Sequence, residues 1–142
     1  MILDEIAART RQRVEEEKAQ LSLDEMRARA LAMEATTDFP FEAALRAPGI
    51  SFICEVKKAS PSKGIIAQEF PYLSIARDYQ AVGAAALSVL TEPYYFKGSD
   101  AYLREIAQAV DTPLLRKDFV VDSYMIYQAK TLGASAVLLI CA

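Results

Sequence analysis

Apolar positions in the first 48 residues recur at helical spacing among charged ones. A loose stripe is formed by Ile2, Ile6, Ala7, Val14 and Leu21. Ser22 precedes Glu25 by three residues, which is the pattern of a capping box, and predicts a second helix that runs through Met33. Asp38-Phe39-Pro40 interrupts the pattern, and a short helix over 41–45 ends at Pro48-Gly49. Residues 1–48 therefore read as a helical N-terminal extension.

From residue 50 short apolar, β-favouring runs alternate with helical patterns. The runs cover 51–57, 84–90, 113–117 and 134–140. Helices are expected over 71–82, from the N-cap Ser99 to residue 110, and from the N-cap Asp122 to Gly133. Alternation of strand, loop and helix at this pace predicts βα units around a parallel sheet.

An internal repeat sets the size of the unit. AVGAAALSVL (81–90) and TLGASAVLLI (131–140) share a glycine followed by a buried strand. Two units fit between the two glycines, and their separation therefore gives the length of one unit. Eight such units and the helical extension need about 250 residues, which is the usual size of a (β/α)8 TIM barrel. We therefore predict an α/β fold, with 49–142 as the first four strands of an incomplete barrel. The chain is expected to be truncated there, with an unpaired strand edge at 140–142.

An open, flavodoxin-like sheet is the alternative architecture. Such a sheet has helices on both faces and strands that are apolar on both sides. Here Glu and Lys occur at the ends of the first and third strands, which suits the interior of a curled sheet. The pattern therefore favours the barrel.

Composition excludes several kinds of chemistry. The formal net charge of −3 argues against nucleic-acid or membrane partners bound through bulk charge. The chain has no histidine, so proton transfer must use Lys, Glu, Asp, Tyr or Cys. Cys54 and Cys141 each lie in an apolar run, as reduced thiols do, and no apolar stretch reaches membrane-spanning length. We expect a cytoplasmic protein without a redox or zinc site built from sulfur ligands.

Three charged residues are candidates for catalysis. Period-two geometry places Glu55 and Lys57 on one face of the first strand, while Phe52, Cys54 and Val56 pack under the helices. Lys117 ends the third strand and should reach the same rim, where barrel active sites are built. The alternative is a structural ion pair inside the barrel.

The loops add candidate binding residues. Ser60 lies in the polar loop 59–64, which could bind a carboxylate or a phosphate or could simply be a solvated loop. Phe96 and Phe119 follow the second and third strands, where aromatic rings either cap the core or clamp a planar ligand.

Longer strings of residues resemble one family. FICEVKKASPSKG (52–64), ALSVLTEPYYFKGS (86–99) and LLRKDFVVDSYMIYQAKTLGA (114–134) resemble the first units of indole-3-glycerol-phosphate synthase. The motifs ExK-x2-SPS, LTE-x3-F and KDF carry the resemblance in this order, and AVLLI (136–140) extends it. Residues 1–48 resemble the family's N-terminal extension in length and character.

The resemblance implies a reaction and a site. The family converts 1-(2-carboxyphenylamino)-1-deoxyribulose 5-phosphate to indole-3-glycerol phosphate, in tryptophan biosynthesis, without metal or organic cofactor. Lys117 would be the general acid in ring closure, and Lys57 with Glu55 would serve the later dehydration. Ser60 would contact the anthranilate carboxylate region. The pocket for the aromatic ring would be lined by Phe96, Phe119 and Leu138.

The family's residues on strands five to seven, and its phosphate-binding turn after strand eight, have no counterpart here, so the 142-residue chain is expected to be inactive alone. A phosphoribosylanthranilate isomerase-like barrel is one alternative, although Cys54 is expected to face away from the barrel interior. A non-catalytic half-barrel that associates with itself through its open edges is another.

Overall fold

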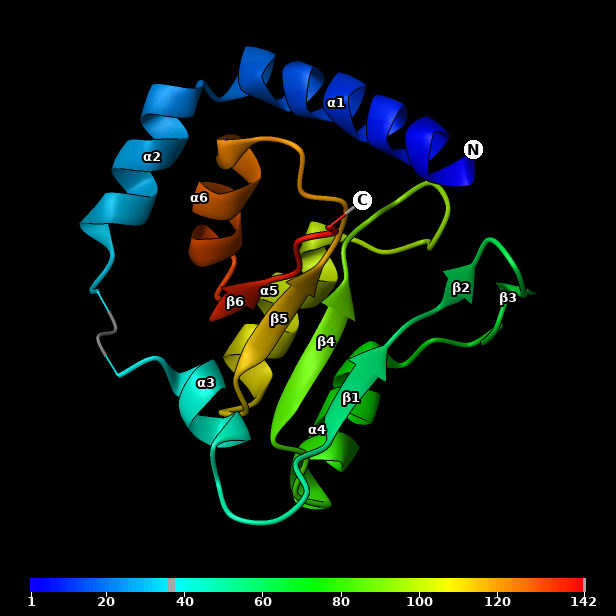
Figure 1. The fold of residues 1–142 in the computed structure, drawn as a ribbon, viewed down its shortest axis with the longest axis vertical. Helices are drawn as coiled ribbons and strands as arrows, with labels where there is room; N and C mark the ends of the chain where they lie inside the picture. Colours follow the sequence, from blue (N-terminus) through cyan, green and yellow to red (C-terminus); the bar gives the residue numbers. More distant parts are fainter. Residues whose placement is uncertain (36–37, 142) are drawn as a thin grey trace.

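A four-stranded parallel sheet forms the centre of the structure, a computed structural model that describes residues 1–35 and 38–141 (Figure 1). The strand order is β1-β4-β5-β6, and the strands are β1 (Ile53–Val56), β4 (Ala86–Leu90), β5 (Leu114–Lys117) and β6 (Ala136–Val137). Each new strand joins the same edge of the sheet, whereas a doubly wound sheet reverses its direction at a switch point. The order is consistent with part of a TIM barrel, and the predicted parallel sheet is confirmed.

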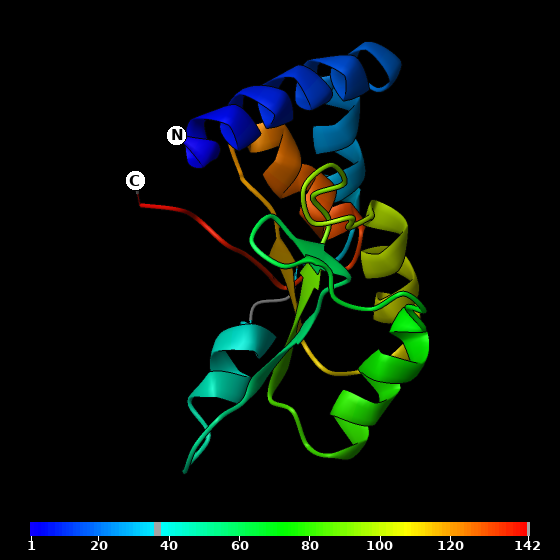
Figure 2. The same ribbon diagram turned by 90° about the vertical axis from the view of Figure 1, so that its right-hand side faces the viewer.

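Helices α4 (Tyr72–Ala81) and α5 (Asp100–Ala109) cover one face of this sheet, and α6 (Ser123–Thr131) connects β5 to β6 (Figure 2). The core between helices and sheet is apolar and nearly closed to solvent. It contains Val56, Ala76, Leu87, Val89, Leu103, Ile106, Val110, Leu114 and Leu132. The other face of the sheet carries the candidate catalytic residues.

The N-terminal segment forms α1 (Ile2–Gln20), α2 (Leu23–Ala32) and α3 (Pro40–Leu45). Helix α1 crosses above the carboxyl ends of the strands, α2 packs on α6, and α3 lies near the opposite ends of the strands (Figure 1). The buried positions of α1 are Ile6, Thr10, Arg13 and Val14. They keep helical spacing, but two of them are polar, which an apolar stripe does not predict. None of the helices in the described ranges is long and apolar enough to span a membrane.

Three helix starts follow the predicted capping chemistry. The Ser22 side chain accepts the N–H of Glu25, whose carboxylate accepts the N–H of Ser22 in return. Ser99 caps α5 and Asp122 caps α6, each by accepting an N–H from the first turn. These contacts join near neighbours in the chain, so the sequence alone predicts them.

Three expectations on residues 51–64 and 134–142 are wrong. Residues 59–65 form a small antiparallel hairpin, β2 (Ala59–Ser60) and β3 (Gly64–Ile65), where only a loop was expected; Gly64 turns the chain at φ 64°. Phe52 is 65% exposed, because it precedes β1 and the helices cover only the strand itself. Of the expected strand 134–140, only Ala136 and Val137 form β6; main-chain hydrogen bonds from Ser135 N–H to Leu114 O and from Leu138 N–H to Arg116 O flank it, and 139–141 do not pair with β5. Ala142 lies outside the described residues.

We predict that the two repeat glycines differ in their tolerance of a side chain. Both follow a helix at positive φ, 94° for Gly133 and 85° for Gly83. A Cβ at Gly133 would lie 2.5 Å from the Cβ of Ala107, whereas one at Gly83 would meet nothing within 4 Å. Gly83→Ala should lower the free energy of unfolding by about 1 kcal/mol through backbone strain alone. Gly133→Ala should lower the free energy of unfolding by about 1–3 kcal/mol more than Gly83→Ala does. Urea unfolding followed by circular dichroism measures both, and equal losses would contradict the steric account.

Candidate active site

Glu55 binds two lysines on the inner face of the sheet. Lys57 Nζ lies 3.0 Å from Glu55 Oε1, and Lys117 Nζ lies 2.9 Å from Glu55 Oε2. Ser88 Oγ donates to the same Oε2 at 3.1 Å. The structure therefore brings together the three charged residues that the sequence singles out.

Strand register produces this meeting. Glu55 pairs with Ser88, and Ser88 with Leu115, so these residues form one row across three parallel strands. Residues in one row point to the same face of a sheet. Lys117 lies two residues beyond Leu115 on that face, at the carboxyl end of β5, from which its side chain reaches Glu55.

Two ammonium groups share one carboxylate at this rim. Burial by itself would raise the pKa of Glu55, but the hydrogen bonds from Lys117 and Lys57 outweigh burial and lower the pKa below its ordinary value. Glu55 is therefore ionised at neutral pH, and the cluster keeps an excess of one positive charge.

A cavity of about 530 Å³ opens beside this cluster. Four predicted site residues line it, namely Lys57, Ser60, Phe96 and Phe119. The two phenylalanine rings lie 6.0 Å apart between centroids, with their planes at 40°. The remaining lining residues are Ile2, Leu3, Ile6, Pro61, Ser62, Lys63 and Ile66. The apolar wall from α1 was not expected, because no local pattern relates that helix to the rim.

Leu138 is not brought to this cavity. It follows β6, and its N–H donates to the carbonyl of Arg116 at 3.3 Å. Cys54 packs against the helix-side core, on the face away from Glu55. Among residues 1–35 and 38–141, no group of three acidic or cysteine side chains is arranged to hold a metal ion.

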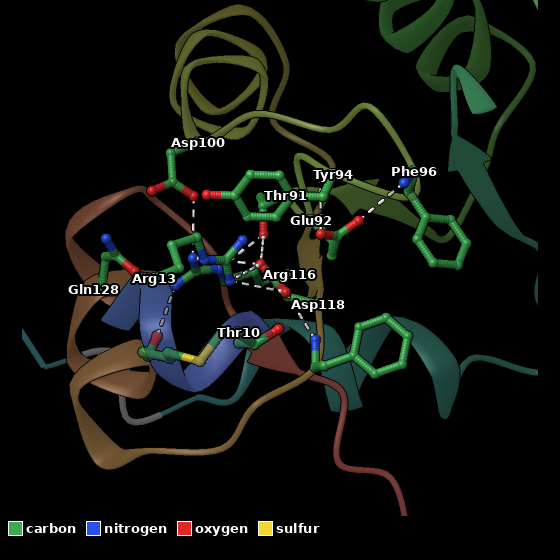
Figure 3. Close-up of polar contacts among 12 residues, drawn as sticks. Thr10, Arg13, Thr91, Glu92, Tyr94, Phe96, Asp100, Arg116, Asp118 and Gln128 are labelled. Carbon is green, nitrogen blue, oxygen red and sulfur yellow. Dashed lines mark hydrogen bonds and ion pairs between the residues drawn. The ribbon is translucent and has the colours of Figure 1, made fainter. Parts of the chain in front are cut away.

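A buried polar network supports the rim from the helix side, and sequence reasoning missed it (Figure 3). Its centre is Arg116, which is 1% exposed. The guanidinium donates to Thr91 Oγ1 at 3.0 Å, to Gln128 Oε1 at 2.8 Å, and to Asp100 Oδ1 at 3.1 Å. The signal in the sequence is a charged residue at a strand position that faces the helices, where only a well-paired side chain can be buried.

Asp118 joins this network to α1. Arg13 Nη2 lies 3.0 Å from each carboxylate oxygen, and Thr91 Oγ1 donates to Oδ2 at 2.6 Å. Asp118 Oδ1 also accepts the N–H of Phe119 at 2.8 Å. One carboxylate thus connects the N-terminal helix, the end of β4 and an aromatic residue of the cavity.

A second contact fastens α1 to the loop after β4, because the Arg9 guanidinium lies 4.2 Å from the centre of the Tyr94 ring. That loop is shaped by Glu92, a buried acid that accepts the N–H groups of Tyr94, Tyr95 and Phe96. Figure 3 shows Glu92 with Tyr94 and Phe96. Glu92 and Asp118 are the acids of the LTE and KDF motifs, so both motifs contain a residue that holds a phenylalanine of the cavity.

Comparison with known proteins identifies the family of this chain. Residues 3–142 match the family model of indole-3-glycerol phosphate synthase. The chain belongs to this family. Indole-3-glycerol phosphate synthases from Ruminiclostridium cellulolyticum and Endomicrobium trichonymphae are 52% and 54% identical to it over 142 residues. Both matches cover 100% of this chain but 55% of the relative, so the chain spans about half the length of these synthases.

The Arg13–Asp118 pair is predicted to be a major stabilising contact of α1. Its side chains are 9% and 0% exposed, so Arg13→Met would leave a buried carboxylate without its main partner. We expect the free energy of unfolding to fall by about 3 kcal/mol. Arg46→Met is the matched control, because Arg46 and Glu42 form an exposed pair that contributes less than about 1 kcal/mol. Urea titration of both variants measures the difference, and similar losses would contradict the prediction.

The lowered pKa of Glu55 predicts how stability depends on pH. The folded state binds this proton less readily than the unfolded state, so the ion pairs stabilise the fold above the ordinary value of 4.5. That contribution is lost as the pH falls through the lower pKa of the folded state. The unfolding free energies of the native chain and of Glu55→Gln should therefore converge in acid. A difference that stays constant from about pH 7 to about pH 3 would contradict the shift.

Proposed function

We propose that the full-length protein, of which this chain forms the first half, is an indole-3-glycerol phosphate synthase of tryptophan biosynthesis. Its reaction would be the decarboxylating ring closure of 1-(2-carboxyphenylamino)-1-deoxyribulose 5-phosphate. The observation that supports this most directly is a cavity that combines two aromatic rings with Lys57, Lys63 and Ser60, directly beside the Glu55 cluster. Such a cavity suits an aromatic anion.

The parts of the substrate correspond to parts of the cavity. We assign the anthranilate ring to the space between Phe96 and Phe119, whose tilted rings offer an apolar clamp. Ser60 and the ammonium group of Lys57 would bind the anthranilate carboxylate region. Leu138 does not line this cavity, and its assignment to the ring pocket rests on the family resemblance alone.

The chemistry requires acids rather than a metal or imidazole. In ring closure, a bond forms between the ring carbon that carries the carboxylate and the ribulose carbonyl carbon, while Lys117 donates a proton to the carbonyl oxygen. Loss of CO2 then restores the aromatic ring. The hydroxyl formed in the first step leaves as water with a proton from the Lys57–Glu55 pair, which also accepts the proton released on forming the indole double bond. Glu55, 2.9 Å from Lys117 and 3.0 Å from Lys57, is close enough to pass protons to either.

We further propose that the 142-residue chain does not turn over substrate alone. Phosphate sites of TIM barrels are commonly built after strands seven and eight. By family resemblance, further acidic and amide side chains also come from strands five to seven. Of the alternatives, the isomerase-like reaction is not favoured, because Cys54 packs on the helix side of β1.

The proposal is tested in a chimera, called the completed protein below, that joins residues 1–142 to the remaining portion of the Ruminiclostridium cellulolyticum relative. We expect it to form indole-3-glycerol phosphate and the unextended chain to form none. Lys117→Met should lower kcat by at least about 100-fold, since it removes a general acid. Lys58→Met is the control: Lys58 is the next residue after Lys57 but does not line the cavity, so activity should remain. A folded chimera without product, or full activity of Lys117→Met, would overturn the assignment.

A further inference from the structure

Glu92 is an unusual buried acid. It is 1% exposed, and among the described residues it has no cationic partner within ion-pair distance. Its carboxylate is held instead by main-chain N–H groups, from Tyr94 to Oε1 at 2.9 Å, from Tyr95 to Oε2 at 2.7 Å and from Phe96 to Oε2 at 2.9 Å. Burying a carboxylate that has no counter-charge is costly, so the role of Glu92 must lie in what these three hydrogen bonds do.

The hydrogen bonds of Glu92 determine the shape of the loop that presents Phe96. The loop closes on itself, because Gly98 N–H donates to the carbonyl of Glu92 at 2.8 Å. Gly98 packs so closely on the carbonyl of Leu90 that any Cβ would clash with it. Both ends of the loop are therefore fixed on the main chain, and the carboxylate fixes its middle. Of the three residues whose N–H groups it accepts, only Phe96 lines the cavity.

We propose that Glu92 is a positioning residue, which holds the Phe96 ring at the distance and tilt from Phe119 that the aromatic part of the substrate requires. This inference rests on the proposed function. Glu92 touches no reacting atom in this assignment and acts only through Phe96. Asp118 accepts the N–H of Phe119 in the same way, but its bonds to Arg13 already explain its burial. Glu92 has no such second task.

The test uses Glu92→Gln in the completed protein. Glutamine keeps the shape but offers one acceptor oxygen in place of two, so the three N–H groups cannot all remain bound. KM should rise about tenfold while kcat changes less than about twofold, because binding of the ring is weakened without loss of the acid groups. Glu105→Gln is the matched control. The Glu105 carboxylate accepts the hydroxyl of Tyr72 between α5 and α4, outside the cavity and outside the Arg116 network, so this variant should leave KM unchanged.

A double-mutant cycle with Phe96→Ala asks whether Glu92 acts through that ring. Phe96→Ala should raise KM, and adding Glu92→Gln should raise it little further. Fully additive effects, or equal KM changes in Glu92→Gln and Glu105→Gln, would overturn the positioning role. If Glu92→Gln does not fold, Glu92→Asp, which keeps the charge but withdraws the oxygens from the loop, replaces it in the same cycle. A parent chimera that folds but forms no product would instead refute the proposed function.

Discussion

Three consecutive charged residues at the end of β5 point in different directions, and their placement determines the rest of the site. Alternation along the strand sends Arg116 to the helix side and Lys117 to the inner face, and Asp118 then turns to α1 at the rim. Each of the three meets its own counter-charge or acceptors there. A shift of one residue in register would turn Arg116 to the inner face and Lys117 to the helix side, so that neither side chain would meet the partners it has now. The register is therefore enforced by charge as well as by the apolar core.

Packing alone could attach α1 to the sheet, so its buried ion pair needs a separate reason. Ion pairs removed from water gain little net stability over apolar contacts of the same size. The guanidinium of Arg13 fixes the orientation of α1. It contacts both oxygens of Asp118 at 3.0 Å and so restricts the angle of the helix. At that angle Ile2, Leu3 and Ile6 reach the cavity. The N-terminal helix is thus a wall of the candidate site as well as an extension of the barrel.

Sequence reasoning succeeded where the deciding contacts are local. The caps at Ser22, Ser99 and Asp122 join residues at most three apart, and the shared face of Glu55 and Lys57 follows from strand geometry alone. The Arg13–Asp118 contact spans 105 positions, so no local pattern could reveal it. The apolar run 134–140 resembles a full strand, but a strand also needs a paired neighbour, and the main-chain contacts with β5 extend only from Ser135 to Leu138. Phe52 was misplaced for a similar reason, because alternation gives the face of a residue but not how far the helices extend over it.

The net charge of this protein and the charge around the cavity have opposite signs. A net charge of −3 would repel an anion from the molecule as a whole. At the rim, however, Lys57 and Lys117 face a single carboxylate, and Lys63 lines the same cavity with no acid among its lining residues. Because salt screens exposed charges beyond about 10 Å, the field that a bound ligand experiences is set by these near lysines and not by the acids on the far surface. For the proposed substrate, one cavity would therefore attract the carboxylate and desolvate the aromatic ring, with the ammonium groups of the Glu55 cluster beside it.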